Sequence, residues 1–203
     1  MKQTRRTIIA ALLAFVSLAS FQILLRAGPE EAQIKDIRAR YNAIEGAKLP
    51  SKKIEFETQD EPLFGTCTLY SKGTEVVKIH LSQGAGDHCA SDEYFYYDDG
   101  TLFFAYASDG IWQFTGETLA NGESETVDMV TEHRVYFAGD KTVRHLTKKV
   151  SSKKPDHLAG LLAKAANVPS HDPDRAATLL AHGKAAYTVK SPADLGRLLT
   201  ASE

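Results

Sequence analysis

The strongest constraint on the fold is a series of short runs, rich in aromatic and β-branched residues, that are separated by tight-turn signals. Signals such as Asp99-Gly100 and Asp109-Gly110 place a glycine where a tight turn needs a positive φ. Turns this short join antiparallel neighbours and leave no room for crossover helices, so the pattern predicts an antiparallel meander of about six to eight strands. The predicted strands are residues 54–58, 64–70, 75–81, 93–98, 101–107, 111–115, 133–138 and 141–147.

One amphipathic helix is expected before the meander, at residues 30–48. Ile34, Ile37, Tyr41 and Ile44 recur at spacings of three, four and three, which places them on one helix face. We expect this face to pack on the sheet. The alternative is a coiled coil with a partner, for which the stretch is short.

Short helices are expected after the meander, at residues 155–167, 172–184 and 191–201. Ser191, followed by a proline and an aspartate, is a suitable N-cap for the last of them. Isolated helices of this length are unstable in water, so they must dock on something. Docking on the sheet is the main expectation, and docking on a separate partner is the alternative.

A leader precedes these elements. Residues 1–6 are basic, and residues 8–25 are apolar apart from two serines and a glutamine, as is typical of an export signal. Ser17 and Ala19 fit a cleavage site, whereas the apolar residues that continue to Leu25 favour a retained anchor in the inner membrane. In either case the positive-inside rule places the rest of the chain outside the cytoplasm, in the periplasm or secreted.

The domain organisation follows from these elements. We expect a signal peptide or signal anchor at residues 1–26, a helix-plus-meander domain at 29–150 and a short-helix extension at 155–203. The fold class is therefore α+β. The formal net charge of −2, with Lys and Arg spread along the chain, argues against a nucleic-acid partner.

The two cysteines, Cys67 and Cys89, would face an oxidising compartment, where an even count favours a disulfide. The expected strands oppose this pairing, because a middle strand would lie between the two residues. Two strand spacings of about 4.8 Å each exceed the usual Cα–Cα separation of a disulfide. A disulfide is the main expectation. Two unreactive thiols or a metal site are the alternatives.

Aromatic residues are concentrated around the Asp99-Gly100 turn. A two-residue turn predicts that Tyr97 pairs with Leu102 and that Phe95 pairs with Phe104. Both faces of this hairpin are then aromatic, so both should be at least partly covered. Most of the rings should be core, but exposed aromatics favour contacts with a protein, peptide or glycan. The candidate binding residues are Tyr94, Tyr96, Phe103, Tyr106 and Trp112.

Catalytic signals are weak. One Gly-rich loop gathers an acid, an imidazole and a thiol, which a nucleophilic site would require: Asp87, His88 and Cys89, with Asp92 and Glu93. Oxidation of Cys89 would remove the nucleophile. The carboxylates Asp98, Asp99 and Asp109 are explained by turns, and the spacing of His157, His171 and His182 does not favour zinc. We expect neither a catalytic residue nor a cofactor or metal.

One resemblance carries information about architecture. The segment 37–44, the strand 93–97 that runs into 99–106, and the hairpin 132–137 together resemble a group of uncharacterised bacterial secreted proteins and lipoproteins over residues 34–150. The resemblance implies an N-terminal helix and an antiparallel meander, and it implies no activity and no catalytic residue. The chain departs from the group by lacking a lipidation cysteine and by its C-terminal extension.

Three functions remain open at this stage. The first is a non-catalytic envelope module that binds a protein, peptide or cell-wall component through the sheet face. The second is an envelope hydrolase that uses the loop from Asp87 to Glu93. The third is a structural or assembly factor in which the Ile34 helix acts as a spacer from a retained anchor.

Overall fold

The computed structural model describes residues 28–58, 63–85 and 89–201. The chain forms two compact units, one ending at Asp36 and one running from Ile37 to Glu203. The expected leader, Asp87 and His88 lie outside the described residues. Within the described ranges, every helix is too short or too polar to cross a bilayer.

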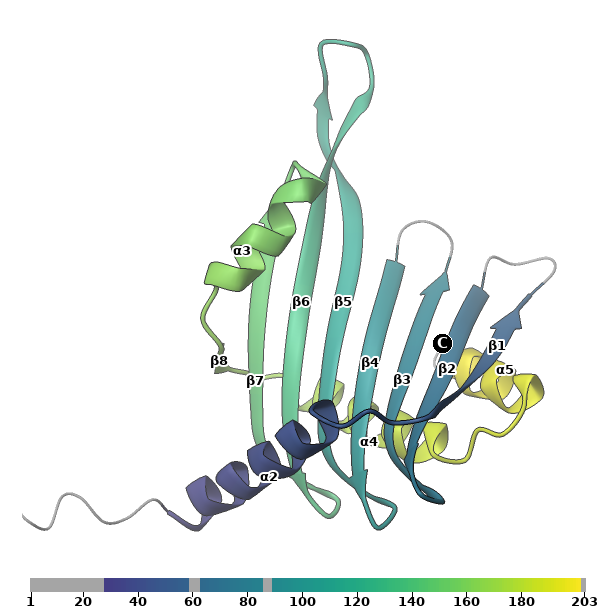
Figure 1. Ribbon diagram of the computed structural model, residues 1–203. Helices are drawn as coiled ribbons and strands as arrows, with labels where there is room; N and C mark the ends of the chain where they lie inside the picture. The colour runs from purple at the N-terminus through teal and green to yellow at the C-terminus, as the bar shows by residue number, and fades with distance from the viewer. Residues whose placement is uncertain (1–27, 59–62, 86–88, 202–203) are drawn as a thin grey trace, which may run out of the picture. The chain divides into compact units, whose positions relative to one another are not determined.

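The predicted α+β meander is confirmed. One sheet of eight antiparallel strands follows the order of the sequence from β1 to β8, so each strand pairs with the next one along the chain (Figure 1). The strands are β1 (Ser51–Glu57), β2 (Leu63–Lys72), β3 (Glu75–Ala85), β4 (Cys89–Asp98), β5 (Thr101–Thr118), β6 (Ser124–Ala138), β7 (Lys141–Ser152) and β8 (Val168–Pro169).

The turn predicted at Asp109-Gly110 is wrong. Both residues lie inside β5, a single strand of 18 residues, where they pair with Thr131 and Val130 of β6. A glycine is therefore compatible here with an extended strand, because the neighbouring strands on both sides continue the ladder.

The predicted register of the aromatic hairpin is correct only next to its turn. Tyr97 pairs with Leu102 as expected, but a bulge after Tyr96 shifts the rest by one residue, so that Phe95 pairs with Ala105 instead of Phe104. A bulge adds one unpaired residue to a strand and strengthens its twist. The β2–β3 and β6–β7 hairpins carry irregularities at the corresponding position, close to their turns.

The helices agree with the sequence expectations. The first helix, α2 (Pro29–Glu45), has Glu30 and Glu31 in its first turn, where the helix dipole favours acidic residues. A short 3₁₀ turn, η1 (Pro155–His157), leads into α3 (Leu158–Lys164). The remaining helices are α4 (Pro173–Ala186) and α5 (Pro192–Thr200), the latter beginning with a capping box formed by Ser191 and Asp194.

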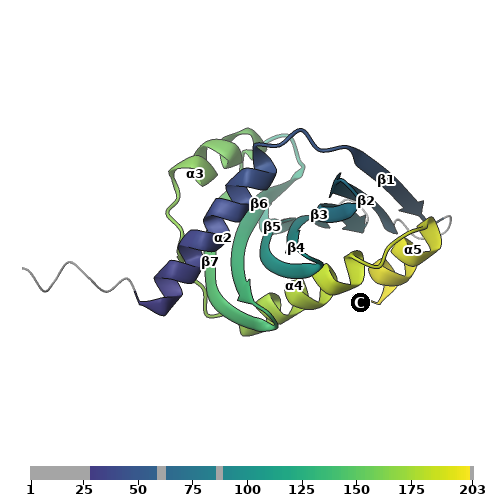
Figure 2. The same ribbon diagram turned by 60° about the horizontal axis from the view of Figure 1, so that its bottom comes forward.

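The main core lies between the sheet and the C-terminal helices. Strands of the second unit curl in Figure 2, and α4 and α5 run along one side of them. Leu179 of α4 and Leu195 of α5 are fully buried in the same cluster as Ile79, Phe95 and Val135 of the sheet. The expected docking of the C-terminal helices on the sheet is therefore confirmed.

Gly183 lets α4 approach the sheet closely. A Cβ atom placed on Gly183 would lie 2.7 Å from Leu102 Cδ2 and 2.9 Å from Phe95 Cδ1. The Tyr97 hydroxyl also donates a hydrogen bond of 2.7 Å to the Gly183 carbonyl oxygen. No side chain larger than hydrogen fits here without moving the helix or the core.

We predict that Gly183→Ala lowers the free energy of unfolding by about 1–3 kcal/mol, because the added methyl overpacks the core. The control is Gly160→Ala in α3, where nothing lies within 4 Å of the added Cβ. This control should leave stability unchanged or raise it by up to about 1 kcal/mol, since alanine is the better helix former. Urea unfolding measures both, and equal effects of the two variants would contradict the close packing.

Candidate functional site

The side of β2–β6 that is turned away from α4 and α5 is only partly covered, and we call it the open face. Within the second unit, Tyr41 of α2 packs on this face with its ring centroid 5.0 Å from Tyr96 and 5.4 Å from Phe104. At β7, Lys148 donates a hydrogen bond of 3.1 Å to the Leu162 carbonyl of α3. The helix prediction is thus confirmed for residues from Ile37 on, while the sheet between these two helices remains accessible.

Strand register arranges the open face in rows, because alternate residues of each strand point to the same side. Three rows matter here, and each joins residues that pair across neighbouring strands. The aromatic row consists of Thr68, His80, Tyr94, Tyr106 and Arg134; the polar row of Thr66, Ser82, Asp92, Ser108 and Glu132; and the small-residue row of Gly84, Ala90 and Gly110.

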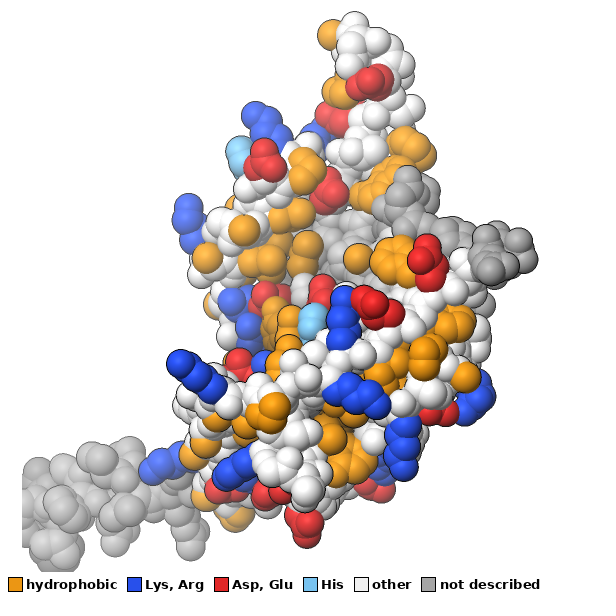
Figure 3. Space-filling model, turned by 45° about the vertical axis from the view of Figure 1, so that its right-hand side comes forward, with side chains coloured by type: hydrophobic (Ala, Val, Ile, Leu, Met, Phe, Trp, Pro, Cys, Tyr) orange, Lys and Arg blue, Asp and Glu red, His pale blue; other side chains and the backbone are white. Residues whose placement is uncertain are grey.

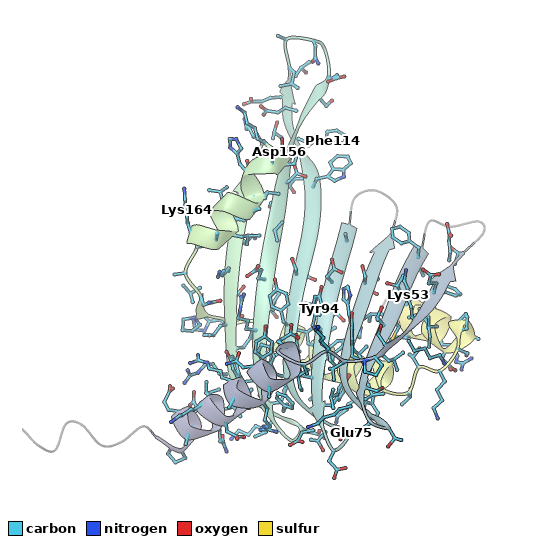
Figure 4. The ribbon with its side chains drawn as sticks, viewed as in Figure 1. Lys53, Glu75, Tyr94, Phe114, Asp156 and Lys164 are labelled. Atoms are coloured by element: carbon cyan, nitrogen blue, oxygen red, sulfur yellow. The ribbon has the colours of Figure 1, made fainter. Side chains whose placement is uncertain are left out.

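The aromatic row is built of rings that stand side by side. His80 and Tyr94 stack with centroids 4.2 Å apart and planes 3° from parallel, and Tyr94 lies 5.8 Å from Tyr106. Figure 4 shows Tyr94 in the middle of the sheet, above the end of α2. Asp92 fixes the imidazole through a contact of 2.7 Å from its Oδ1 to His80 Nε2. These contacts hold the rings in place without a ligand.

A pocket of about 300 Å³ opens where the helix meets the aromatic row. Arg134 and Arg38 both lie over its tyrosine rings, with the Arg134 guanidinium 5.0 Å from the Tyr106 centroid. Glu132 neutralises Arg134 at 2.9 Å, whereas Arg38 is exposed and has no carboxylate partner among the described residues. The pocket is lined by Ile37, Arg38, Tyr41, Asn42, Phe104, Tyr106, Arg134 and Tyr136.

Glu132 also bonds Tyr106. The Tyr106 hydroxyl donates to Glu132 Oε1 at 2.9 Å. Burial, followed by the hydrogen bond to Glu132, raises the pKa of Tyr106 to about 12, so the phenol stays protonated at neutral pH. The pocket therefore offers a neutral ring and one guanidinium that no carboxylate of the described chain neutralises.

The five candidate binding residues do not form one surface. Tyr96 and Phe103 are each only 3% exposed and belong to the packing between helix and sheet, so they do not line an accessible site. Burial and the nearby Glu45 carboxylate raise the pKa of Tyr96. Tyr94, Tyr106 and Trp112 are half-buried on the open face. Sequence pattern could not separate the two groups because both are aromatic residues of the same hairpin.

The predicted disulfide is wrong: Cys67 and Cys89 are free thiols. Cys67 of β2 pairs with Leu81 of β3, and Leu81 pairs with Glu93 of β4, so Cys67 and β4 are separated by a full strand. Cys89 lies four residues away from Glu93 along β4. Cys67 is buried, and burial raises the pKa of its thiol to about 11, while Cys89 is exposed.

We predict that a thiol reagent modifies Cys89 of the native protein rapidly and reaches Cys67 only after unfolding. The reason is the burial and raised pKa of Cys67. Counting labelled thiols by mass spectrometry before and after denaturant tests this, and Cys89→Ser should remove the fast phase. If no thiol reacts until a reductant is added, the two cysteines are bridged.

A buried charge cluster fastens α4 to the sheet. Glu93 is fully buried, and its carboxylate lies 3.0 Å from Arg175 Nη2 and 2.9 Å from His182 Nδ1. Arg175 also donates two hydrogen bonds, of 3.1 and 2.7 Å, to Asp109. A buried carboxylate requires such partners, because an unpaired charge in the interior is strongly unfavourable.

The cluster continues into a histidine pair. His133 Nδ1 lies 2.9 Å from His145 Nε2, and His133 Nε2 lies 3.6 Å from Asp109. Burial lowers the pKa of both imidazoles below the usual value near 6.5, and for His133 the attraction of Asp109 opposes the burial only in part. Both rings are therefore neutral at pH 7. In this state one of the two facing nitrogens, His133 Nδ1 or His145 Nε2, carries a hydrogen and donates it to the other.

We predict that the free energy of unfolding falls as the pH drops below 6.5. The unfolded chain then binds protons that the folded His133 and His145 resist, so this contribution is complete above pH 6.5 and is lost toward the lower folded-state pKa. Urea unfolding over this range measures it. The double variant His133→Gln, His145→Gln should flatten the dependence, whereas exposed His157→Gln should not; equal slopes in all three proteins would contradict the assignment.

The remaining sequence candidates have structural roles. Asp98 pairs with Arg40 at 3.1 Å, and Asp99 takes a positive φ of 49° in its turn, as the turn explanation predicts. Asp109 does not lie in a turn and belongs to the buried cluster, which sequence reasoning missed because Arg175 is 66 residues away. Within the described part of the chain, no three His, Cys, Asp or Glu side chains are grouped to hold a metal ion.

A second pocket lies on the side of the sheet that faces α5. It has a volume of about 290 Å³ and is lined by Cys89, Ser91, Asp109, Ile111 and Leu199, among others. The Ser91 hydroxyl donates a hydrogen bond of 2.7 Å to Asp109. Neither that hydroxyl nor the Cys89 thiol is bonded to an imidazole among the described residues.

Comparison with protein-family models, curated proteins and solved structures found no match to the chain. Fold and site together define an α+β protein in which C-terminal helices cover much of one face of an antiparallel meander and the other face is partly open.

Proposed function

We propose that the protein is a non-catalytic binding module of the bacterial cell envelope and that it holds its ligand on the open face. The observation that carries this proposal is the accessible row of ordered rings, His80 and Tyr94, on the sheet face. Beside it lies the pocket that holds Arg38, whose guanidinium no carboxylate of the described chain neutralises. Such a surface combines apolar contact area with a few polar groups that orient a ligand. The basic, apolar leader supports the location in the periplasm or outside the cell.

The alternative hydrolase has less support. Glu93, one of the three acids of the suggested loop, is fully buried and bonded to α4, so it cannot reach a substrate. The Ser91 hydroxyl donates to the Asp109 carboxylate, which is already bound by Arg175, and not to an imidazole. A nucleophile needs an adjacent base within hydrogen-bond distance.

The structural or assembly role rests on the leader and on the helix as a spacer. A spacer helix would need no accessible aromatic row. The ordered rings of His80 and Tyr94 on a partly open face favour binding over that role.

We predict that Arg38→Ala weakens binding of an envelope ligand about tenfold or more, the expected loss of one charge-assisted hydrogen bond. Full-length protein is titrated separately with solubilised cell-wall fragments, envelope polysaccharide and envelope peptides, and binding is followed by calorimetry. Arg197→Ala is the matched control, because Arg197 is an exposed arginine of α5.

The proposal holds if at least one fraction binds saturably and a substitution on the open face, Arg38→Ala at the pocket or Phe64→Ala at the β2 end, weakens binding while Arg197→Ala does not. It fails if none of the three fractions binds, or if neither open-face substitution has a larger effect than Arg197→Ala. Circular dichroism confirms that both arginine variants fold, which is expected for two exposed side chains.

A further inference from the structure

We infer that the ligand of the open face is an uncharged glycan chain that lies across strands β2 to β5, with Phe64 and Trp112 as stacking platforms. This inference rests on the proposed function and names the ligand class. It is carried by the polar row, by the small-residue row beside it, and by the aromatic side chains at the two ends of these rows.

The two rows form a trough of small and hydroxyl-bearing residues. Thr66, Ser82 and Ser108 are half-buried, and their hydroxyl groups make no hydrogen bond to other described residues. Each can donate one hydrogen bond and accept two. The small-residue row beside them leaves space above the backbone, since a Cβ placed on Gly110 would meet only the Ala90 carbonyl, at 3.7 Å.

A flat aromatic side chain lies at the β2 end of the trough. A Cβ placed on Gly84 would come within 2.5 Å of the Phe64 ring, so the ring rests directly over that glycine. Phe64 is nevertheless 48% exposed. Because glycine carries no side chain, the ring lies against the sheet and its other side faces solvent, which is the geometry on which the apolar C–H groups of a sugar ring stack.

Aromatic side chains also lie at the β5 end. Trp112 is half-buried, and Phe114 is 60% exposed with its ring 5.2 Å from the indole in an edge-to-face contact. Phe114 appears beside the upper part of β5 in Figure 4. Phe64 and Trp112 are separated by three strand spacings, or about 14 Å at 4.8 Å per strand, so a ligand that contacts both must be elongated.

Among the described residues, the trough leaves no cation free for an anionic ligand. Asp92 bonds His80, and Glu132 pairs with Arg134 and lies 3.9 Å from Lys148. Carboxylates also stand opposite both aromatic ends, Glu57 opposite Phe64 and Asp128 opposite Trp112. In Figure 3 the surface is hollowed between hydrophobic side chains above and a band of acidic, basic and histidine side chains below. An uncharged ligand with many hydroxyl groups suits such a surface better than an anionic polymer does, because an anionic polymer would be repelled by these carboxylates.

A peptide fits this trough less well. Extended peptides bind by adding a strand to a sheet edge and by inserting alternate side chains into pockets. The trough lies on the face of β2–β5, where backbone groups already pair between neighbours, and it offers the hydroxyl groups of Thr66, Ser82 and Ser108 rather than side-chain pockets.

The experiment uses the fluorescence of Trp112, which is the single tryptophan of the chain. Full-length protein is titrated with neutral cello- and chitooligosaccharides, from disaccharide to hexasaccharide. We expect the Trp112 emission to change saturably, with an affinity that rises with length until the oligomer spans the trough. Phe64→Ala should weaken binding about tenfold, because it removes one of the two stacking platforms.

Two matched glycine variants test the position of the ligand. Gly110→Leu fills the trough and should abolish the response, whereas Gly160→Leu places the same side chain in open space on α3 and should leave it intact. Ile111→Ala removes an exposed side chain from the opposite face of β5 and should also have no effect.

The outcomes separate the inference from the proposed function. If envelope peptides or anionic fragments bind through Arg38 while no neutral oligosaccharide changes Trp112 emission, the module stands and the glycan inference is overturned. If oligosaccharides bind but Gly110→Leu binds them as wild type does, the trough is not the site. If nothing binds, both proposals fail.

Discussion

The whole arrangement depends on the docking of α4 and α5 against one face of the meander. Leu179 and Leu195 supply buried apolar area, and Gly183 allows the helix to approach the rings of the sheet. Glu93 fixes the position of α4 on the sheet, because its buried carboxylate is stable only when Arg175 and His182 of α4 lie next to it. These helices cover much of that face, whereas the opposite face stays partly open.

The open face is built to stay ordered without a ligand. The rings of His80, Tyr94 and Tyr106 support one another across three strands, and the neighbouring Glu132 is paired with Arg134. Preorganised side chains lose little conformational entropy on binding, which favours affinity. The same face leaves the hydroxyl groups of the polar row without a protein partner among the described residues.

The candidate site was only partly predictable. Tyr94, Tyr106 and Trp112 could be found from aromatic content, but Tyr96 and Phe103 could not be told apart from them, because only the packing of α2 residues Tyr41 and Arg40 on those two rings covers them. The small-residue row has no local signal, since Gly84 and Ala90 become neighbours only through strand register. The disulfide prediction failed for the same reason: an even cysteine count carries no information on register.

The sequence by itself determined the strand meander, its antiparallel order and the helices at both ends, since period-two hydrophobicity, short glycine turns and helix caps are local properties. Tertiary structure alone decided which face is covered, where the bulges fall and that Asp109 meets Arg175 across 66 residues. Those features depend on packing and pairing between segments that are far apart in the sequence. A local pattern does not specify which distant segment it will contact.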